Sequence, residues 1–133
     1  MNTKQIYKKI AKANNFWIRP WLVITDNPKM NAICHLFWIN LYQGCVDNYT
    51  EDEMAFVLAH ELAHLRFSHF LNLQSPYVQE YEADQLGAQY MAKAGYDLKK
   101  GVQVFKKWKN IATDTHPSSK ARLRKFHYIL GEK

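Results

Sequence analysis

The chain of 133 residues has few cysteines, prolines and glycines, and it has no long hydrophobic run. Its two cysteines, Cys34 and Cys45, allow one disulfide at most, which excludes a disulfide scaffold and favours reduced thiols. No segment approaches the roughly 18 consecutive apolar residues that a membrane-spanning helix needs. Residues 1–16 alternate lysines with apolar side chains and therefore lack the apolar stretch of a signal peptide. These absences predict a cytoplasmic protein without a membrane span.

The composition is that of a globular domain with an excess of basic residues. Hydrophobic residues make up 47% of the chain, which is enough for one core, so we expect a single domain over residues 1–133. Lysine and arginine number 18 against 12 aspartates and glutamates, a net charge of +6. Solvated lysines explain this charge better than a nucleic-acid partner, because the basic residues of the C-terminal third interleave with a helical apolar stripe. No feature predicts an oligomeric state.

Apolar periodicity and capping signals predict mainly helical structure with a few strands. Thr50 and Glu53 form a capping box, so a helix should begin at Glu51 and run to about His69. Residues 17–25 and 31–42 are rich in aromatic and β-branched side chains and predict strands, the second being one strand or a hairpin. Further helices are expected at residues 3–14, 76–94, 98–111 and 118–130. We therefore expect an α+β fold in which a small antiparallel sheet packs on the helix of residues 51–69.

The most informative motif is His60-Glu61-Leu62-Ala63-His64. On a helix, residues i and i+4 project from one face, so both imidazoles can bind a single zinc ion. Glu61, between them, can reach a water on that metal and act as a base. Chance placement yields this pattern in roughly one chain of a hundred with this composition. The alternative interpretation is a surface or core helix whose two histidines bind no metal.

The following helix contains a candidate for the third ligand that catalytic zinc requires. If the two helices form an antiparallel hairpin, nearly equal rises place Glu80 level with His64 and Asp84 level with His60. Glu80 is then the predicted third ligand, and Asp84 can bind the far nitrogen of His60 and fix its tautomer. Gly87 continues the same stripe and would allow close contact between the helices. The alternative interpretation is a solvated acidic face.

The pentad 60–64 followed by Glu80-Tyr81-Glu82-Ala83-Asp84 resembles peptidase family M48, the zinc metallopeptidases of the gluzincin type. The resemblance covers residues 28–130 and implies a zincin-like fold, one zinc ion held by His60, His64 and Glu80, and hydrolysis of peptide or protein substrates. The short connection between the two motifs resembles the small single-domain minigluzincins. Four further segments support the resemblance: Asn31-Ala32, Gln43-Gly44, Ala94-Gly95-Tyr96-Asp97, and Thr115-His116-Pro117-Ser118 followed by Arg122.

The resemblance also implies roles for residues outside the ligand set. His116 would face the zinc and stabilise the oxyanion, whereas the alternative is a histidine that only serves a turn. Arg122 would pair with Asp84 or another carboxylate, or else lie on the surface.

The alternative to an endopeptidase is a latent or non-catalytic zinc protein. So short a chain could leave the substrate cleft blocked or too shallow to hold a substrate. An exposed sheet edge is expected to bind the substrate as an added strand, and its residues are Asn31, Ala32, Ile33, Cys34 and His35.

Overall fold

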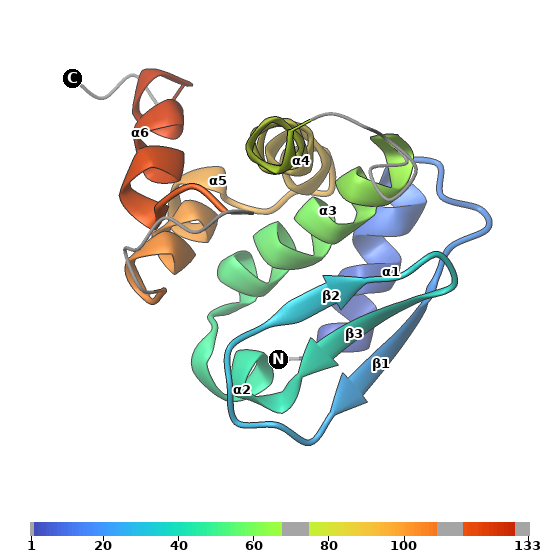
Figure 1. Ribbon diagram of the computed structural model, residues 1–133. Coiled ribbons are helices and arrows are strands. Elements are labelled where there is room, and N and C mark those ends of the chain that lie inside the picture. The colour runs from blue at the N-terminus through green and yellow to red at the C-terminus, as the bar shows by residue number, and fades with distance from the viewer. Residues whose placement is uncertain (1, 68–74, 109–115, 130–133) are drawn as a thin grey trace.

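The computed structural model describes residues 2–67, 75–108 and 116–129, and its fold is mainly helical with one small sheet (Figure 1). The α+β class is therefore confirmed. Among the described helices, none has the length and apolar character needed to cross a bilayer. The elements in chain order are α1 (Thr3–Ala13), β1 (Trp21–Thr25), β2 (Ala32–Cys34), β3 (Trp38–Tyr42), α2 (Gln43–Asn48), α3 (Glu51–Phe67), α4 (Pro76–Lys93), α5 (Leu98–Gly101), a 3₁₀ helix (Val102–Lys106) and α6 (Ser119–Ile129).

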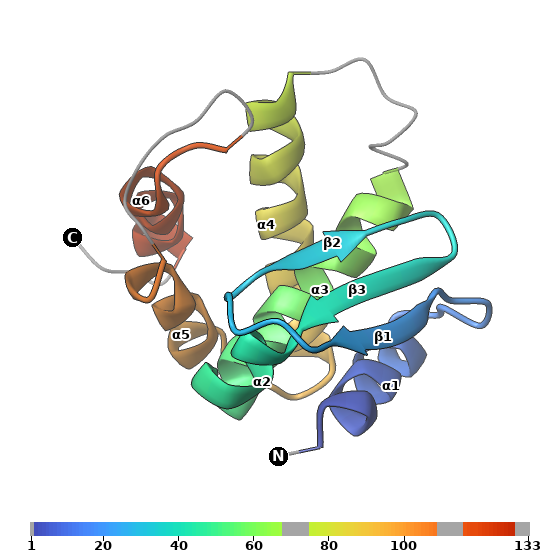
Figure 2. The same ribbon diagram turned by 60° about the horizontal axis from the view of Figure 1, so that its bottom comes forward.

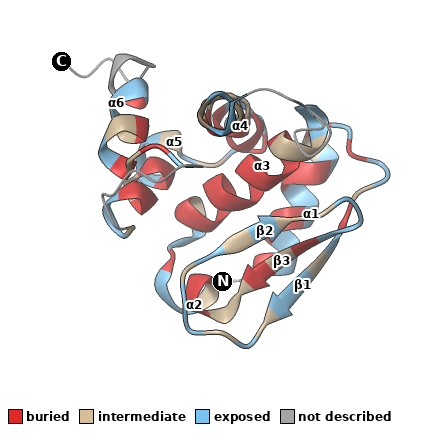
Figure 3. Ribbon diagram, in the orientation of Figure 1, coloured by how far each residue is buried: buried red, intermediate tan, exposed pale blue. Residues whose placement is uncertain are grey.

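The three strands form a mixed sheet in the order β1-β3-β2. The hairpin of β2 and β3 is antiparallel, as expected, but β1 pairs with β3 in parallel. The prediction of a purely antiparallel sheet is therefore wrong. The reason is that β3 contributes the fully buried Ile39 and Leu41, so it takes the central position, whereas β1 is largely exposed (Figure 3). The exposed strand β1 is left at one edge and β2 at the other.

Helix α3 forms the centre of the molecule. Its residues 53–63 are all buried, and Figure 3 shows burial along most of its length. Helices α1 and α4 and strand β2 pack around it (Figures 1 and 2). On another side, Phe56 of α3 makes edge-to-face contacts with Phe105 of the 3₁₀ helix and Phe126 of α6. A helix buried on nearly all sides places polar residues inside the protein, and in α3 these are Glu53, His60 and Glu61.

The start of α3 and its packing against α4 follow the sequence signals. The Glu53 amide donates to Thr50 Oγ1 at 3.2 Å and the Thr50 amide donates to Glu53 Oε1 at 2.9 Å, which is the predicted capping box. Helices α3 and α4 pack together over a long contact. A Cβ at Gly87 would lie 2.9 Å from the Cα of His60, so the glycine permits this close approach. The helical hairpin predicted from the sequence is thus present.

Several boundaries differ from those predicted. Residues 43 and 44 follow the region predicted to be extended and begin the short helix α2, in which a Cβ at Gly44 would collide with the Pro28 carbonyl oxygen. The helix expected from Leu98 divides into the short α5 and the 3₁₀ helix. Strand β1 begins at Trp21 because Pro20 precedes it and cannot donate a ladder hydrogen bond. The predicted helix positions His69, Ile111 and Leu130, and Thr115 of the C-terminal motif, lie outside the described residues.

Candidate metal centre

The side chains of His60, His64 and Glu80 converge on one point between α3 and α4. His60 Nε2 and His64 Nε2 are 2.9 Å apart. Glu80 Oε1 lies 2.7 Å from His64 Nε2 and 3.6 Å from His60 Nε2. His60 and Glu80 are each 7% exposed, so the point is shielded from bulk water. The arrangement follows from the i, i+4 spacing of the histidines on α3 and from the antiparallel packing of α4.

These three donor atoms fit a zinc ion. Zinc bonds of about 2.1 Å in tetrahedral geometry separate neighbouring ligand atoms by roughly 3.4 Å. The three observed separations, 2.7, 2.9 and 3.6 Å, bracket this value. Two imidazole nitrogens with one carboxylate oxygen are also a known ligand set of catalytic zinc. The donor chemistry and the spacing therefore agree.

The electrostatics of the cluster favour a cation. Burial opposes ionisation of Glu80, but the charge of His60 and hydrogen bonds from His116 and both ligand histidines hold the pKa of Glu80 far below its ordinary value. Burial opposes protonation of His60 as well, yet Glu80 and Asp84 raise the pKa of His60 to about 10. Burial and the nearby His60 lower the pKa of His64. An ionised carboxylate and a negative environment around His60 are what a metal site requires.

Asp84 connects His60, a candidate ligand, to α6. Asp84 Oδ1 lies 2.8 Å from His60 Nδ1. Arg122 donates to both carboxylate oxygens, from Nε to Oδ2 at 2.8 Å and from a terminal nitrogen to Oδ1 at 2.7 Å. Although burial opposes ionisation, these bonds from Arg122 lower the pKa of Asp84, so its carboxylate accepts the Nδ1 proton of His60. In the neutral imidazole that metal binding requires, the lone pair of His60 is then on Nε2, which faces His64 and Glu80.

Glu61 lies next to the three candidate ligands and is not part of their cluster. It is 7% exposed, and within the described part of the chain it has no hydrogen-bonding partner. Burial raises the pKa of Glu61 to about 7, against the opposing effect of the His60 charge. Its side chain lines the cavity that also contains the ligands. A carboxylate in this state can take up and release a proton near neutral pH.

His116 and Glu80, a candidate ligand, are in contact in the wall of this cavity. His116 Nδ1 lies 3.1 Å from Glu80 Oε2, and its side chain is 58% exposed. Arg122 approaches the same Glu80 oxygen at 3.5 Å. The segment before α6 thus brings His116 to Glu80 of α4, and α6 itself brings Arg122 to Glu80 and Asp84.

The cavity has a volume of about 790 Å³ and extends from the ligands along β2. Among the described strands, β2 pairs with β3 alone, so its other edge faces the cavity. Of the five predicted edge residues, Ala32, Ile33 and Cys34 form β2, while Asn31 and His35 flank it. His35 is the one that does not line the cavity; its amide donates to Trp38 O and its ring stacks on the Trp38 indole. Both cysteines are free thiols.

Two residues of the cavity wall carry no recognisable signal in the sequence. Trp108 donates from Nε1 to the Tyr49 hydroxyl at 2.6 Å, and both side chains line the cavity. Trp108 lies in the helix expected over residues 98–111 and has no predicted role, and no sequence signal marks Tyr49. They are 59 residues apart, so no local spacing links them.

A pair of helices that presents two histidines and a glutamate, beside a second glutamate in an open cavity, is typical of metal-dependent hydrolases. A family model, Peptidase family M48, matches residues 2–77 and 70–130 of this chain. The chain therefore belongs to peptidase family M48. A comparison with curated proteins finds no match.

Proposed function

We propose that the protein is a zinc-dependent endopeptidase that hydrolyses peptide bonds in peptides or proteins. The observation that carries the proposal is the convergence of His60, His64 and Glu80 beside Glu61 in one cavity. The first three residues would hold one zinc ion per chain. When bound, zinc supplies Lewis-acid chemistry, since it lowers the pKa of water and polarises a carbonyl group. Membership of a peptidase family supports a peptide bond as the target.

Glu61 is the proposed general base and acid. It takes a proton from the attacking water and passes that proton to the leaving amine. A pKa of about 7 suits both steps, because the carboxylate is available as a base and its protonated form is a competent acid. Its position in the cavity wall, with no competing partner among the described residues, supports this role.

His116, Asp84 and Arg122 have supporting roles in this proposal. His116 lies at the cavity and can donate a hydrogen bond to negative charge that develops on the substrate oxygen. Asp84 orients His60 through Nδ1, and Arg122 keeps Asp84 ionised. The proposed substrate position is along β2, where an extended peptide would bond to the open strand edge and pass the ligands.

Replacement of Glu61 by glutamine tests the proposal. The wild-type protein with stoichiometric zinc should cleave casein or a peptide library, and Glu61→Gln should lose at least about a hundredfold in kcat/KM. Both proteins should retain one zinc ion per chain by elemental analysis. Glu82→Gln is the matched control, because Glu82 lies on α4 but does not line the cavity. Unchanged cleavage by Glu61→Gln would contradict the role of Glu61. A wild-type protein that binds zinc and cleaves nothing would favour the latent form.

A further inference from the structure

Large apolar side chains are exposed at one end of the sheet, away from the candidate metal centre. Ile18 is 94% exposed, and Trp17 and Trp21 are each 77% exposed. Three of the four tryptophans of the chain belong to this surface. Globular domains rarely expose so many large apolar side chains together unless the surface binds something. We call this surface the aromatic patch, and it consists of Trp17, Ile18, Trp21, Leu36, Phe37 and Trp38.

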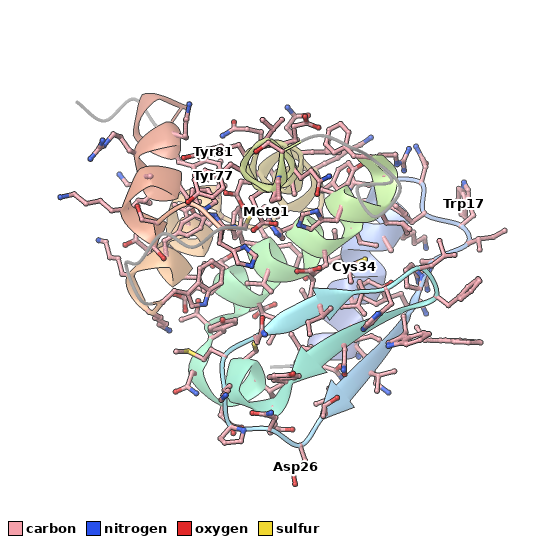
Figure 4. All side chains as sticks on the ribbon, viewed as in Figure 1. Trp17, Asp26, Cys34, Tyr77, Tyr81 and Met91 are labelled. Carbon is pink, nitrogen blue, oxygen red and sulfur yellow. The ribbon has the colours of Figure 1, made fainter. Side chains whose placement is uncertain are left out.

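The aromatic patch is continuous, although it comes from two separate segments. The Trp21 amide donates to Phe37 O at 3.0 Å, and Trp21 is the partner of Trp38 in the β1–β3 register. The connection from α1 to β1 and the turn between β2 and β3 lie side by side at the same end of the sheet in both ribbon views (Figures 1 and 2). Trp17 projects outward from this end in Figure 4.

Positive charge borders the aromatic patch on the side of α1 and of the connection from α1 to β1. Lys4, Lys8 and Arg19 line a shallow depression together with Trp17 and Trp21. Residues 1–46 contain six lysines and arginines and one acidic residue, so they carry +5 of the +6 net charge of the chain. The acidic residue, Asp26, follows the far end of β1 and lies well away from Trp17 (Figure 4).

We propose that the aromatic patch and its basic rim dock the protein on an anionic lipid membrane. Tryptophan is favoured at the membrane interface, where its ring is buried and its N–H remains hydrated. Lysines beside the inserted side chains gain attraction from anionic headgroups. A second copy of the chain is a poorer occupant, because a two-fold contact would bring the same basic rims together. The proposal does not depend on the peptidase activity.

Vesicle flotation of the full chain tests the docking surface. The wild-type protein should float with vesicles of equal parts phosphatidylcholine and phosphatidylglycerol at low salt, and much less with phosphatidylcholine alone or at high salt. Because three of the four tryptophans lie in the patch, their emission should shift to shorter wavelength on binding. Failure of the wild-type protein to bind the anionic vesicles at low salt would overturn the proposal.

Paired variants distinguish the contribution of the aromatic patch to vesicle binding from the contribution of the net charge of the protein. Trp17→Ser with Ile18→Ser should weaken vesicle binding at least about tenfold, whereas Val78→Ser, which removes an exposed apolar side chain of α4, should not. Lys4→Glu with Lys8→Glu should also weaken binding at least about tenfold. Lys99→Glu with Lys100→Glu changes the net charge equally on α5 and should have a smaller effect.

Circular dichroism should show that all these variants fold, because every substituted side chain is exposed. Equal losses from both lysine pairs, or wild-type binding by the tryptophan–isoleucine variant, would refute a defined docking surface. Sedimentation velocity gives a further check. A wild-type dimer that the tryptophan–isoleucine substitution dissociates, without any vesicle binding, would identify a second copy as the occupant and overturn the proposal.

Discussion

Substitution of Gly87 by alanine should loosen the metal centre although the residue touches no metal ligand side chain. The glycine lies on α4 where that helix crosses the backbone of α3. A Cβ there would be 2.9 Å from both Cα and N of His60 and 3.2 Å from the carbonyl carbon of Ala59. All three neighbours are backbone atoms, so no side-chain rotation can relieve the contact.

The effect of the substitution on the free energy of unfolding can be estimated from these distances. Carbon atoms pack at about 3.5–4.0 Å, so α4 must move away from α3 by roughly 0.5–1 Å. Overpacking of this kind costs about 1–3 kcal/mol, and the better helix propensity of alanine returns about 1 kcal/mol. We therefore expect a net loss of up to about 2 kcal/mol in the free energy of unfolding. The same displacement moves Glu80 and Asp84 relative to His60 and should weaken zinc binding about tenfold or more.

Two measurements check this prediction. Competition with a chromogenic chelator gives the zinc affinity, and thermal unfolding with EDTA and with zinc gives the stability of each form. The loss of stability should be larger with zinc, because weaker binding to the folded state adds to the packing cost. Gln89→Ala, on the exposed side of the same helix, should match the wild type. Wild-type zinc affinity in Gly87→Ala would refute the view that this contact positions the ligands.

Two further predictions concern buried groups. Arg122→Met leaves the carboxylate of Asp84, which is 1% exposed, without its cationic partner. It should lower the free energy of unfolding, measured by urea denaturation, by about 3–5 kcal/mol. The control Arg124→Met replaces an exposed residue of the same helix and should change this free energy by less than about 0.5 kcal/mol. Burial raises the pKa of Cys34 to about 12 and also raises the pKa of Cys45, so both thiols stay protonated at neutral pH. Because the thiolate is the reactive form, both cysteines should be alkylated slowly in the native protein and quickly in urea. Mass spectrometry measures the rate of this alkylation. Rapid modification of both native thiols would contradict this.

Much of the helical structure could be predicted because its signals are local. The capping box of Thr50 and Glu53 needs only three residues of sequence, and it forms as expected. The facing of α3 and α4 followed from a fixed rise per residue and a short connection, and Gly87 marked the close contact. Strand order could not be predicted in this way. The position of β1 beside β3 depends on which strand is most buried, and that is decided by packing against helices distant in sequence.

The residues of the candidate site also differ in whether local sequence signals were enough to predict them. The three possible ligands and Asp84 come from two motifs on neighbouring helices, so their spacing was sufficient to bring them together. His116 and Arg122 could be named through the family resemblance alone, since nothing local relates them to residues of α4. Tyr49 and Trp108 were missed because their hydrogen bond joins chain segments that meet only in the folded protein.

The bidentate pair of Arg122 and Asp84 makes the packing of α6 a condition for a correctly oriented His60. Residues 60–84 leave the ribosome well before Arg122, which follows Asp84 by 38 positions. Until α6 packs against Phe56 and brings the arginine in, Asp84 has no cationic partner with which to orient the imidazole. A chain that is still being synthesised, or one that is cut before α6, would therefore contain every ligand yet lack an ordered centre. Among the described elements, α6 is therefore the one that completes the hydrogen bonds by which Asp84 orients His60.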